Sequence, residues 1–266
     1  MIWDNLHIAF FIFFTAWALG TIALFKSYKN SKAQFFSSFL PAIANATLLF
    51  FIVVLWIQIE RPPLKTMAET RLWYAFFVSL ITWGIFLRTK VKSLYILGFI
   101  MSTVFLIVDI IHPEYQNKNL MPALQSPWFI PHVVIYMISY AVLAAACLTA
   151  ITGLFQSKKT GLISQDNILL TMKLIYPGFA LLSIGMIFGA LWAKIAWGNY
   201  WSWDPKETWA LLTWLFYLLC IHLFHAYPKR KKLLIFLIAF SFIILIITWM
   251  GIRFFPSSMN SIHLYG

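Results

Sequence analysis

Long apolar stretches alternate with short polar connections along nearly the whole chain. Eight of them approach the roughly 20 residues that a helix needs to cross the hydrocarbon core of a bilayer. They are residues 6–25, 35–59, 72–87, 94–111, 133–155, 174–192, 205–224 and 233–252. The third is the shortest, and it suits a tilted or half-inserted segment. The pattern predicts an all-α polytopic membrane protein with about eight transmembrane helices.

The composition agrees with this prediction. Of the 266 residues, 62% are hydrophobic and 11% are charged, whereas a soluble domain is roughly 45–50% apolar. The start of the chain lacks the basic region and cleavage site of a signal peptide, so we expect the first apolar run to stay as a span. Cys147 and Cys220 lie in apolar runs and form no CxxC pair, which predicts two buried thiols and no disulfide or zinc site.

The basic residues are distributed unevenly between the two sides of the predicted bundle. The loops after the first, third, fifth and seventh spans hold most of the 20 Lys and Arg residues, and the other side holds most of the acids. By the positive-inside rule, both termini face outward, to the periplasm or lumen. The net charge of +12 therefore marks cytoplasmic loops and not nucleic-acid binding. These loops are short and contain no glycine-rich phosphate loop, which excludes ATP coupling within the chain.

Segment 197–214, WGNYWSWDPKETWALLTW, contains five of the 13 tryptophans. Interfacial anchoring is the plain interpretation, but a platform of indole rings is also suited to stacking against a large planar ligand. Within the segment, Asp204 can cap a helix, Pro205 suits its first position, and Glu207 would complete a capping box. We therefore expect a helix to begin here and to fix the loop before it.

Histidines are the other residues that could form a functional site. His132 lies at the outer end of the fifth span and His263 in the C-terminal tail, about ten residues beyond the eighth span. Two outward imidazoles beside an aromatic platform suit the two axial positions of a haem iron. On spacing alone, two unrelated interfacial histidines explain them as well.

His222 differs because it lies inside an apolar run, about 25 Å along a helix that starts at Pro205. Ionisable groups inside spans usually face a cavity or a partner. His225 is a second candidate for the same role, with His222 as its helper. His7, His112 and Asp109 are at outer span ends, where we expect solvated interfacial residues.

Three motifs resemble a known family. WGNYWSWDPKETWALLTW is similar to the WWD motif of the haem-handling proteins of cytochrome c biogenesis, in particular the CcsA (ResC) branch. LQSPWFIPHVVIYMISYA resembles the segment that carries the family's first external histidine, and SIHLYG resembles the segment that carries the second. The resemblance covers residues 120–266, and the first four spans carry no matching motif.

The resemblance implies a role for each matched residue. His132 and His263 would be the external ligands of haem iron, with Trp197, Trp201, Trp203 and Asp204 in the platform. His222 would be an intramembrane iron ligand, with a second histidine supplied by a CcsB-type (ResB) membrane protein. No residue is assigned to acid-base catalysis.

The implied function is maturation of cytochrome c. Haem b would cross the membrane, be held non-covalently, and be presented to the CxxCH cysteines of an apocytochrome c kept reduced by other proteins. The chain would be a subunit of a holocytochrome c synthase (haem lyase) complex in the bacterial cytoplasmic membrane or a thylakoid membrane.

Two other functions stay open. One is a membrane cytochrome b that retains haem for electron transfer. The other is a secondary transporter of an amphiphilic solute, for which Pro41, Pro177 and the pair Gly185 and Gly189 would mark broken or closely packed helices. In the haem-handling reading, residues 1–111 form a four-helix membrane region, residues 112–266 form the haem-handling region, and residues 253–266 are an external tail.

Overall fold

The computed structural model describes residues 2–26, 31–116, 124 and 126–251. Within these residues, eight helices are long and apolar enough to cross a membrane, which confirms the predicted all-α polytopic class. The chain divides into two compact units, Met1–Leu120 and Met121–Gly266. The sequence-based division at residue 112 concerns function and stays a prediction.

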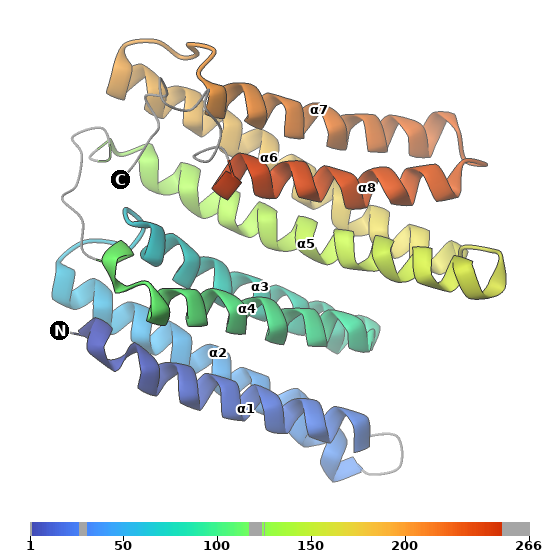
Figure 1. Cartoon of the computed structure of the whole chain (residues 1–266), viewed down its shortest axis with the longest axis horizontal. Helices are drawn as coiled ribbons and strands as arrows, with labels where there is room; N and C mark the ends of the chain where they lie inside the picture. The colour runs from blue at the N-terminus through green and yellow to red at the C-terminus, as the bar shows by residue number, and fades with distance from the viewer. Residues whose placement is uncertain (1, 27–30, 117–123, 125, 252–266) are drawn as a thin grey trace. The chain divides into compact units, whose positions relative to one another are not determined.

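The first unit is built from four consecutive helices that run side by side (Figure 1). They are α1 (Leu6–Lys26), α2 (Ser31–Ile59), α3 (Met67–Thr89) and α4 (Lys92–Ile111), flanked by the short 3-10 helices η1 (Ile2–Asn5) and η2 (Pro113–Tyr115). Each helix packs against the next, and α4 returns to α1. Short connections make neighbours antiparallel, and Trp17 and Tyr95, with ring centroids 4.6 Å apart, join α1 to α4 in the buried centre.

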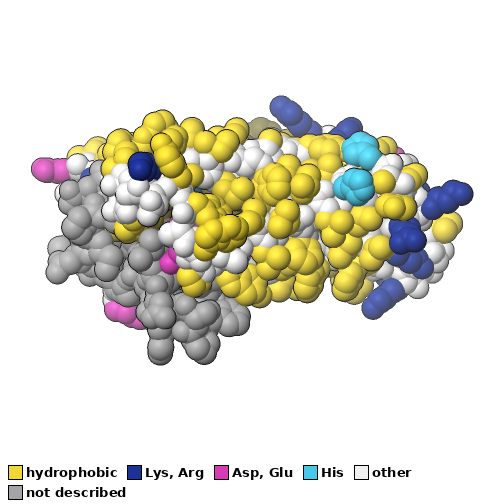
Figure 2. Space-filling model, turned by 90° about the horizontal axis from the view of Figure 1, so that it is seen from above, with side chains coloured by type: hydrophobic (Ala, Val, Ile, Leu, Met, Phe, Trp, Pro, Cys, Tyr) yellow, Lys and Arg dark blue, Asp and Glu magenta, His cyan; other side chains and the backbone are white. Residues whose placement is uncertain are grey.

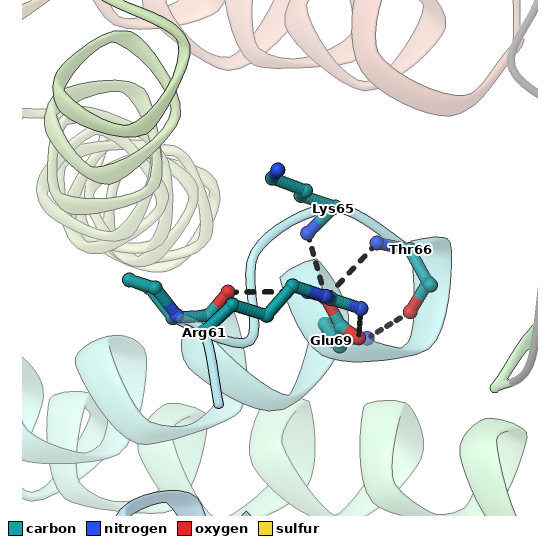
Figure 3. A network of polar contacts seen from close by, with 5 residues as sticks. Arg61, Lys65, Thr66 and Glu69 are labelled. Atoms are coloured by element: carbon teal, nitrogen blue, oxygen red, sulfur yellow. Dashed lines mark hydrogen bonds and ion pairs between the residues drawn. The ribbon is translucent and has the colours of Figure 1, made fainter. Parts of the chain in front are cut away.

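The α2–α3 connection is held by a polar network around Glu69 (Figure 3). Thr66 and Glu69 form a capping box that starts α3. Arg61 donates two hydrogen bonds to the Glu69 carboxylate, at 2.9 and 2.7 Å, and the backbone N–H of Lys65 donates a third at 2.6 Å. Desolvation lowers the pKa of Lys65, and the nearby Arg61 guanidinium acts in the same direction. The connection between α2 and α3 is thus a structured helix start.

Two expectations for this unit were wrong. The third span is not short, because α3 is a continuous helix of 23 residues whose first turn is polar; whether it is tilted or half-inserted stays a prediction. Asp109 is not a solvated interfacial residue, because it is fully buried and accepts a hydrogen bond from Arg71 Nε at 2.6 Å. Its neighbour His112 is exposed as expected and pairs with Glu114.

The second unit contains the longer helices. These are α5 (Phe129–Thr160), α6 (Gln165–Trp197), α7 (Pro205–Ala226) and α8 (Lys231–Ile246), followed by the π-helical turn η4 (Ile247–Gly251). The most extensive packing joins α5 to α6, α7 packs on α6 and α8, and α8 returns to α5. Polar side chains support these contacts: Ser139 Oγ donates to Gly178 O at 2.8 Å, and Trp214 Nε1 donates to Ser183 Oγ at 2.8 Å.

Helices α5 and α6 have 32 and 33 residues, about 48 Å at 1.5 Å per residue, longer than a hydrocarbon core of about 30 Å. Their ends therefore extend beyond the apolar runs that define the spans. Pro41 and Pro177 lie inside continuous helices, so the expectation of helices broken at these prolines was wrong. Cys147 and Cys220 are free and buried, as predicted.

Candidate functional site

His132 lies in the first turn of α5, directly after Pro131, whose missing N–H costs nothing at this position. Its Nδ1 is 2.8 Å from the carbonyl oxygen of Gly185 on α6. A carbonyl oxygen can only accept, so Nδ1 carries the hydrogen in this contact. The neutral ring then has its lone pair on Nε2, which is the tautomer that a metal ligand needs.

Aromatic rings and glycine residues surround the His132 imidazole. The His132 ring stacks on Trp192 with centroids 5.6 Å apart and planes at 29°, and lies 4.5 Å from Tyr136. A Cβ atom added at Gly189 would be 2.8 Å from His132 Cε1, a distance that side chains do not tolerate. Gly185 and Gly189 therefore bring α6 close to α5, as their spacing predicts for closely packed helices.

The aromatic contacts continue into the Trp-rich segment. Trp197 is the last residue of α6, and its ring centroid is 4.8 Å from that of Trp192. Gly198 follows with φ 86° and closes the helix in the left-handed conformation that favours glycine. His132, Trp192 and Trp197 thus form one series of ring contacts at the end of the unit where α6 ends and α7 begins.

The start of α7 fixes the loop as predicted. Asp204 is the N-cap, Pro205 follows it, and Asp204 and Glu207 complete a capping box. Glu207 is buried and accepts hydrogen bonds from Ser202 N at 2.8 Å and Asp204 N at 3.2 Å. The carboxylate therefore holds the backbone on both sides of Trp203.

Trp203 is held in a conformation that non-glycine residues seldom adopt. Its φ is 61°, and its side chain is 68% exposed, with a T-shaped contact to Trp201 at 5.9 Å. A left-handed non-glycine residue costs of the order of 1–3 kcal/mol and persists only where the surroundings impose it. The strained backbone at Trp203 thus coincides with an indole ring that is largely exposed.

Trp203→Gly is therefore expected to change stability and function in opposite directions. Removal of the strain should leave the unfolding temperature of the purified protein unchanged or slightly higher, while the haem-handling activity that the resemblance implies falls because the exposed ring is lost. Thermal unfolding and covalent haem staining measure the two effects. The matched control is Trp56→Gly at an exposed position inside α2, where glycine should lower stability by about 1 kcal/mol. A parallel loss of stability and maturation in Trp203→Gly would contradict the interpretation.

His222 and His225 lie at the opposite end of α7. Both are exposed, and Figure 2 shows two neighbouring histidine side chains on an apolar surface, close to the end where most of the visible Lys and Arg side chains gather. His225 Nε2 is 3.0 Å from the Tyr176 hydroxyl of α6. Because that contact ties His225 to its own unit, His222 is the better placed of the two to meet a group from outside. The choice between them stays a prediction.

The end of α8 returns to the His132 side of the unit. Thr248 Oγ1 donates to Trp209 O at 3.1 Å in the first turns of α7, and Trp249 lies 5.7 Å from Tyr140, two turns along α5 from His132. The description stops at Gly251, so His263 lies outside the described residues. Single-turn π segments are frequent at functional sites, and this one ends twelve positions before His263, the predicted second ligand.

The structure thus brings only some of the predicted site residues into contact with one another. The structure links His132 to Trp197, and Trp201 to Trp203, and it makes Asp204 the cap of α7; His222 lies at the other end of that helix. No group of three or more His, Cys, Asp or Glu side chains suited to a metal ion occurs among the described residues. A planar metal macrocycle needs only two protein ligands, and the orientation of His132 suits one of them.

Sequence reasoning missed two contributors. Trp192 was treated only as the end of a span, although it stacks on His132. Tyr136 follows His132 by four residues, the spacing that places side chains on one helix face. The aromatic periodicity of His132, Tyr136 and Tyr140 was the signal that could have identified this stripe.

Comparison with known proteins gives one consistent result. The model of the family described as "Cytochrome C assembly protein" matches residues 5–260, so the similarity extends over the first four helices as well. "Cytochrome c biogenesis protein CcsA" of Guillardia theta is 31% identical over 90% of this chain and 88% of its own length. The proteins of the same name from Chlamydomonas reinhardtii and Prochlorococcus marinus (strain AS9601) are 30% identical over 91% and 27% identical over 90% of this chain, covering 72% and 87% of their own lengths.

Proposed function

Because this chain belongs to the cytochrome c assembly protein family and is an integral membrane protein with a role in cytochrome c maturation, we propose that it carries haem b across the membrane and presents it to apocytochrome c. The observation that carries the proposal is the contact between His132 Nδ1 and Gly185 O. It fixes the tautomer and the orientation of an imidazole at the aromatic end of the second unit. Such an arrangement prepares Nε2 to coordinate the iron of haem.

His263 supplies the second external ligand. The end of α8 and the start of α5 lie at the same end of the second unit, because η4 contacts α7 near its start. His263 is twelve positions beyond Gly251, and an extended chain over that span reaches about 40 Å. The tail is therefore long enough to bring its imidazole to the face of the haem opposite His132.

Indole rings hold the macrocycle. Trp197, Trp201 and Trp203 offer the aromatic faces, and the Asp204–Glu207 capping box keeps the loop in place. The series from His132 through Trp192 to Trp197 places aromatic rings along one side of the iron ligand. Both termini and this platform face the periplasm or lumen in the proposal, in agreement with the basic loops at the other end.

His222 receives haem at the cytoplasmic side, together with a histidine of a CcsB-type partner. Its exposed position on α7 supports this role, since α7 has the smallest buried share, 17%, among the eight spans of the described chain. The partner histidine would complete a site that this chain leaves open on that helix.

Attachment needs no redox change at the vinyl groups. Each cysteine S–H of the CxxCH motif adds across one vinyl double bond, forming a C–S bond while the hydrogen completes the neighbouring carbon. The chain contributes position: it holds the ring still with its vinyl groups toward the thiols, and proximity lowers the entropic part of the barrier. The substrate histidine of CxxCH then replaces one of the two imidazoles, and the product leaves.

Reconstitution tests this proposal. The chain is expressed with and without a CcsB-type partner in a strain that lacks its own maturation system, and covalent haem in a reporter cytochrome is stained after denaturing electrophoresis. Covalent haem is expected only with both proteins present. Tight haem retention without any transfer would support a cytochrome b, and solute transport by a preparation without haem would support a transporter; either result would refute haem delivery.

A further inference from the structure

A pocket of about 480 Å³ lies between the last turns of α5 and the first turns of α8. Its walls include Phe155 and Phe236, whose side chains are 61% and 56% exposed. The pocket belongs entirely to the second unit and lies at the end opposite His132. Nothing in the haem pathway described above uses it.

Helix packing explains why the pocket exists. The two helices lie close together near Gly153, where an added Cβ atom would be 3.1 Å from Ile235 Cδ1. One turn further along α5, larger side chains replace glycine, and the helices are separated by the pocket. The pocket therefore results from the larger residues that follow Gly153 in the sequence GLFQSK of α5. It is not a cavity left by a missing side chain in the core.

The pocket is polar at one end only. Ser157 lines it from α5, with 7% of its surface exposed. Lys158 and Lys232 also line it, one from each helix, and the Lys158 ammonium is 5.9 Å from the Phe155 ring centroid. The N-terminus of α8, which carries a partial positive charge, begins one residue before Lys232.

We propose that this pocket binds an anionic phospholipid. The phosphate is held by Lys158, Lys232 and the Ser157 hydroxyl, and an acyl chain lies along Phe155 and Phe236. Basic pockets between transmembrane helices recognise anionic head groups in this way, and aromatic walls that face the bilayer favour a ligand with a chain over a free anion. A bound lipid would bridge the basic ends of α5 and α8. His132 lies near the other end of α5, and His263 follows α8 in the sequence. The proposal depends on membrane insertion alone and not on haem delivery.

Native mass spectrometry of the purified full chain tests the proposal. The probes are phosphatidylglycerol and phosphatidylcholine with the same acyl chains. Lys158→Gln/Lys232→Gln removes the two pocket charges, whereas Lys159→Gln/Lys229→Gln removes two exposed charges that do not line the pocket. We expect phosphatidylglycerol to bind in preference to phosphatidylcholine, and the pocket variant to lose about 25-fold in affinity, about fivefold per lysine. The control variant should bind as the unaltered protein does.

Thermal unfolding of the unaltered protein gives a second measurement that needs no variant: phosphatidylglycerol should raise the unfolding temperature and phosphatidylcholine should not. Equal loss of binding in the two double variants would overturn the proposal, because affinity would then follow net charge. Equal binding of the two lipids would overturn it as well. Displacement of bound phosphatidylglycerol by glycerol phosphate at similar concentration would show that only a free anion is recognised, and would also overturn it.

Discussion

His132→Ala is expected to lower covalent haem attachment by about 100-fold and to remove the bis-imidazole absorption bands that the proposed haem site should give in the purified protein with its partner. Changes in the groups that merely orient a metal ligand typically cost 10–100-fold, so removal of the ligand itself should reach at least the upper end of that range. The side chain lies in the first turn of α5 and is only partly buried, so the variant should still fold.

Two further variants separate ligation from packing. In His132→Gly, imidazole added to the solution should restore the absorption bands, because the free ring can occupy the vacated position; a purely structural role would not respond to it. His112→Ala is the matched histidine control, since His112 is an exposed residue of the first unit. Unchanged bands and unchanged maturation in His132→Ala would refute the assignment.

The orientation of His132 can be tested without removing it. Gly189→Ala places a Cβ atom 2.8 Å from His132 Cε1 and forces the ring to move, whereas Gly84→Ala meets nothing within 4 Å. We expect Gly189→Ala to shift the absorption bands and to reduce maturation by about 10-fold, the cost typical of a disturbed orienting contact. Gly84→Ala should have no effect. Equal behaviour of the two variants would show that the position of the ring does not matter.

The features that could be predicted from the sequence alone were those set by residues close together in the chain. The capping box at Asp204 and Glu207 was predicted because its residues lie within one turn of each other and follow a fixed pattern. The same pattern at Thr66 and Glu69 was not predicted, although it is equally local. Span positions were predicted from apolar runs, but the runs ended before the helices did, since polar turns extend beyond the bilayer core.

Contacts between helices could not be predicted from the sequence. Gly185 and Gly189 indicated a close approach, but nothing in the sequence identified His132 and Tyr136 on α5 as the groups that fill the space. His132 and Gly185 are 53 residues apart, and no periodicity specifies that pairing. The family resemblance named His132 as a ligand; the tautomer and the stacked Trp192 required coordinates.

Asp109 illustrates the same limit with a larger energetic consequence. A carboxylate near the end of a span is compatible with an exposed interface, and only the packing of α3 on α4 shows that Arg71 and Asp109 are 2% and 0% exposed. An ion pair so far from solvent is stabilised by its partner and by hydrogen bonds, since either charge alone would be strongly disfavoured.

Asp109→Ala is accordingly expected to destabilise the first unit by about 3–5 kcal/mol, because it leaves the Arg71 charge buried without its carboxylate. Arg71→Met/Asp109→Leu removes both charges and keeps the volume, so it should recover most of that loss. Chemical unfolding of the purified protein in lipid-detergent micelles measures both. Glu114→Ala is the matched control, because it breaks an exposed pair whose 2.7 Å contact is close to the 2.6 Å of the buried pair, and it should change stability little. If the single and double variants lost equal stability, packing rather than the loss of the carboxylate beside the buried Arg71 charge would explain the effect, and Arg71 and Asp109 would contribute through shape alone.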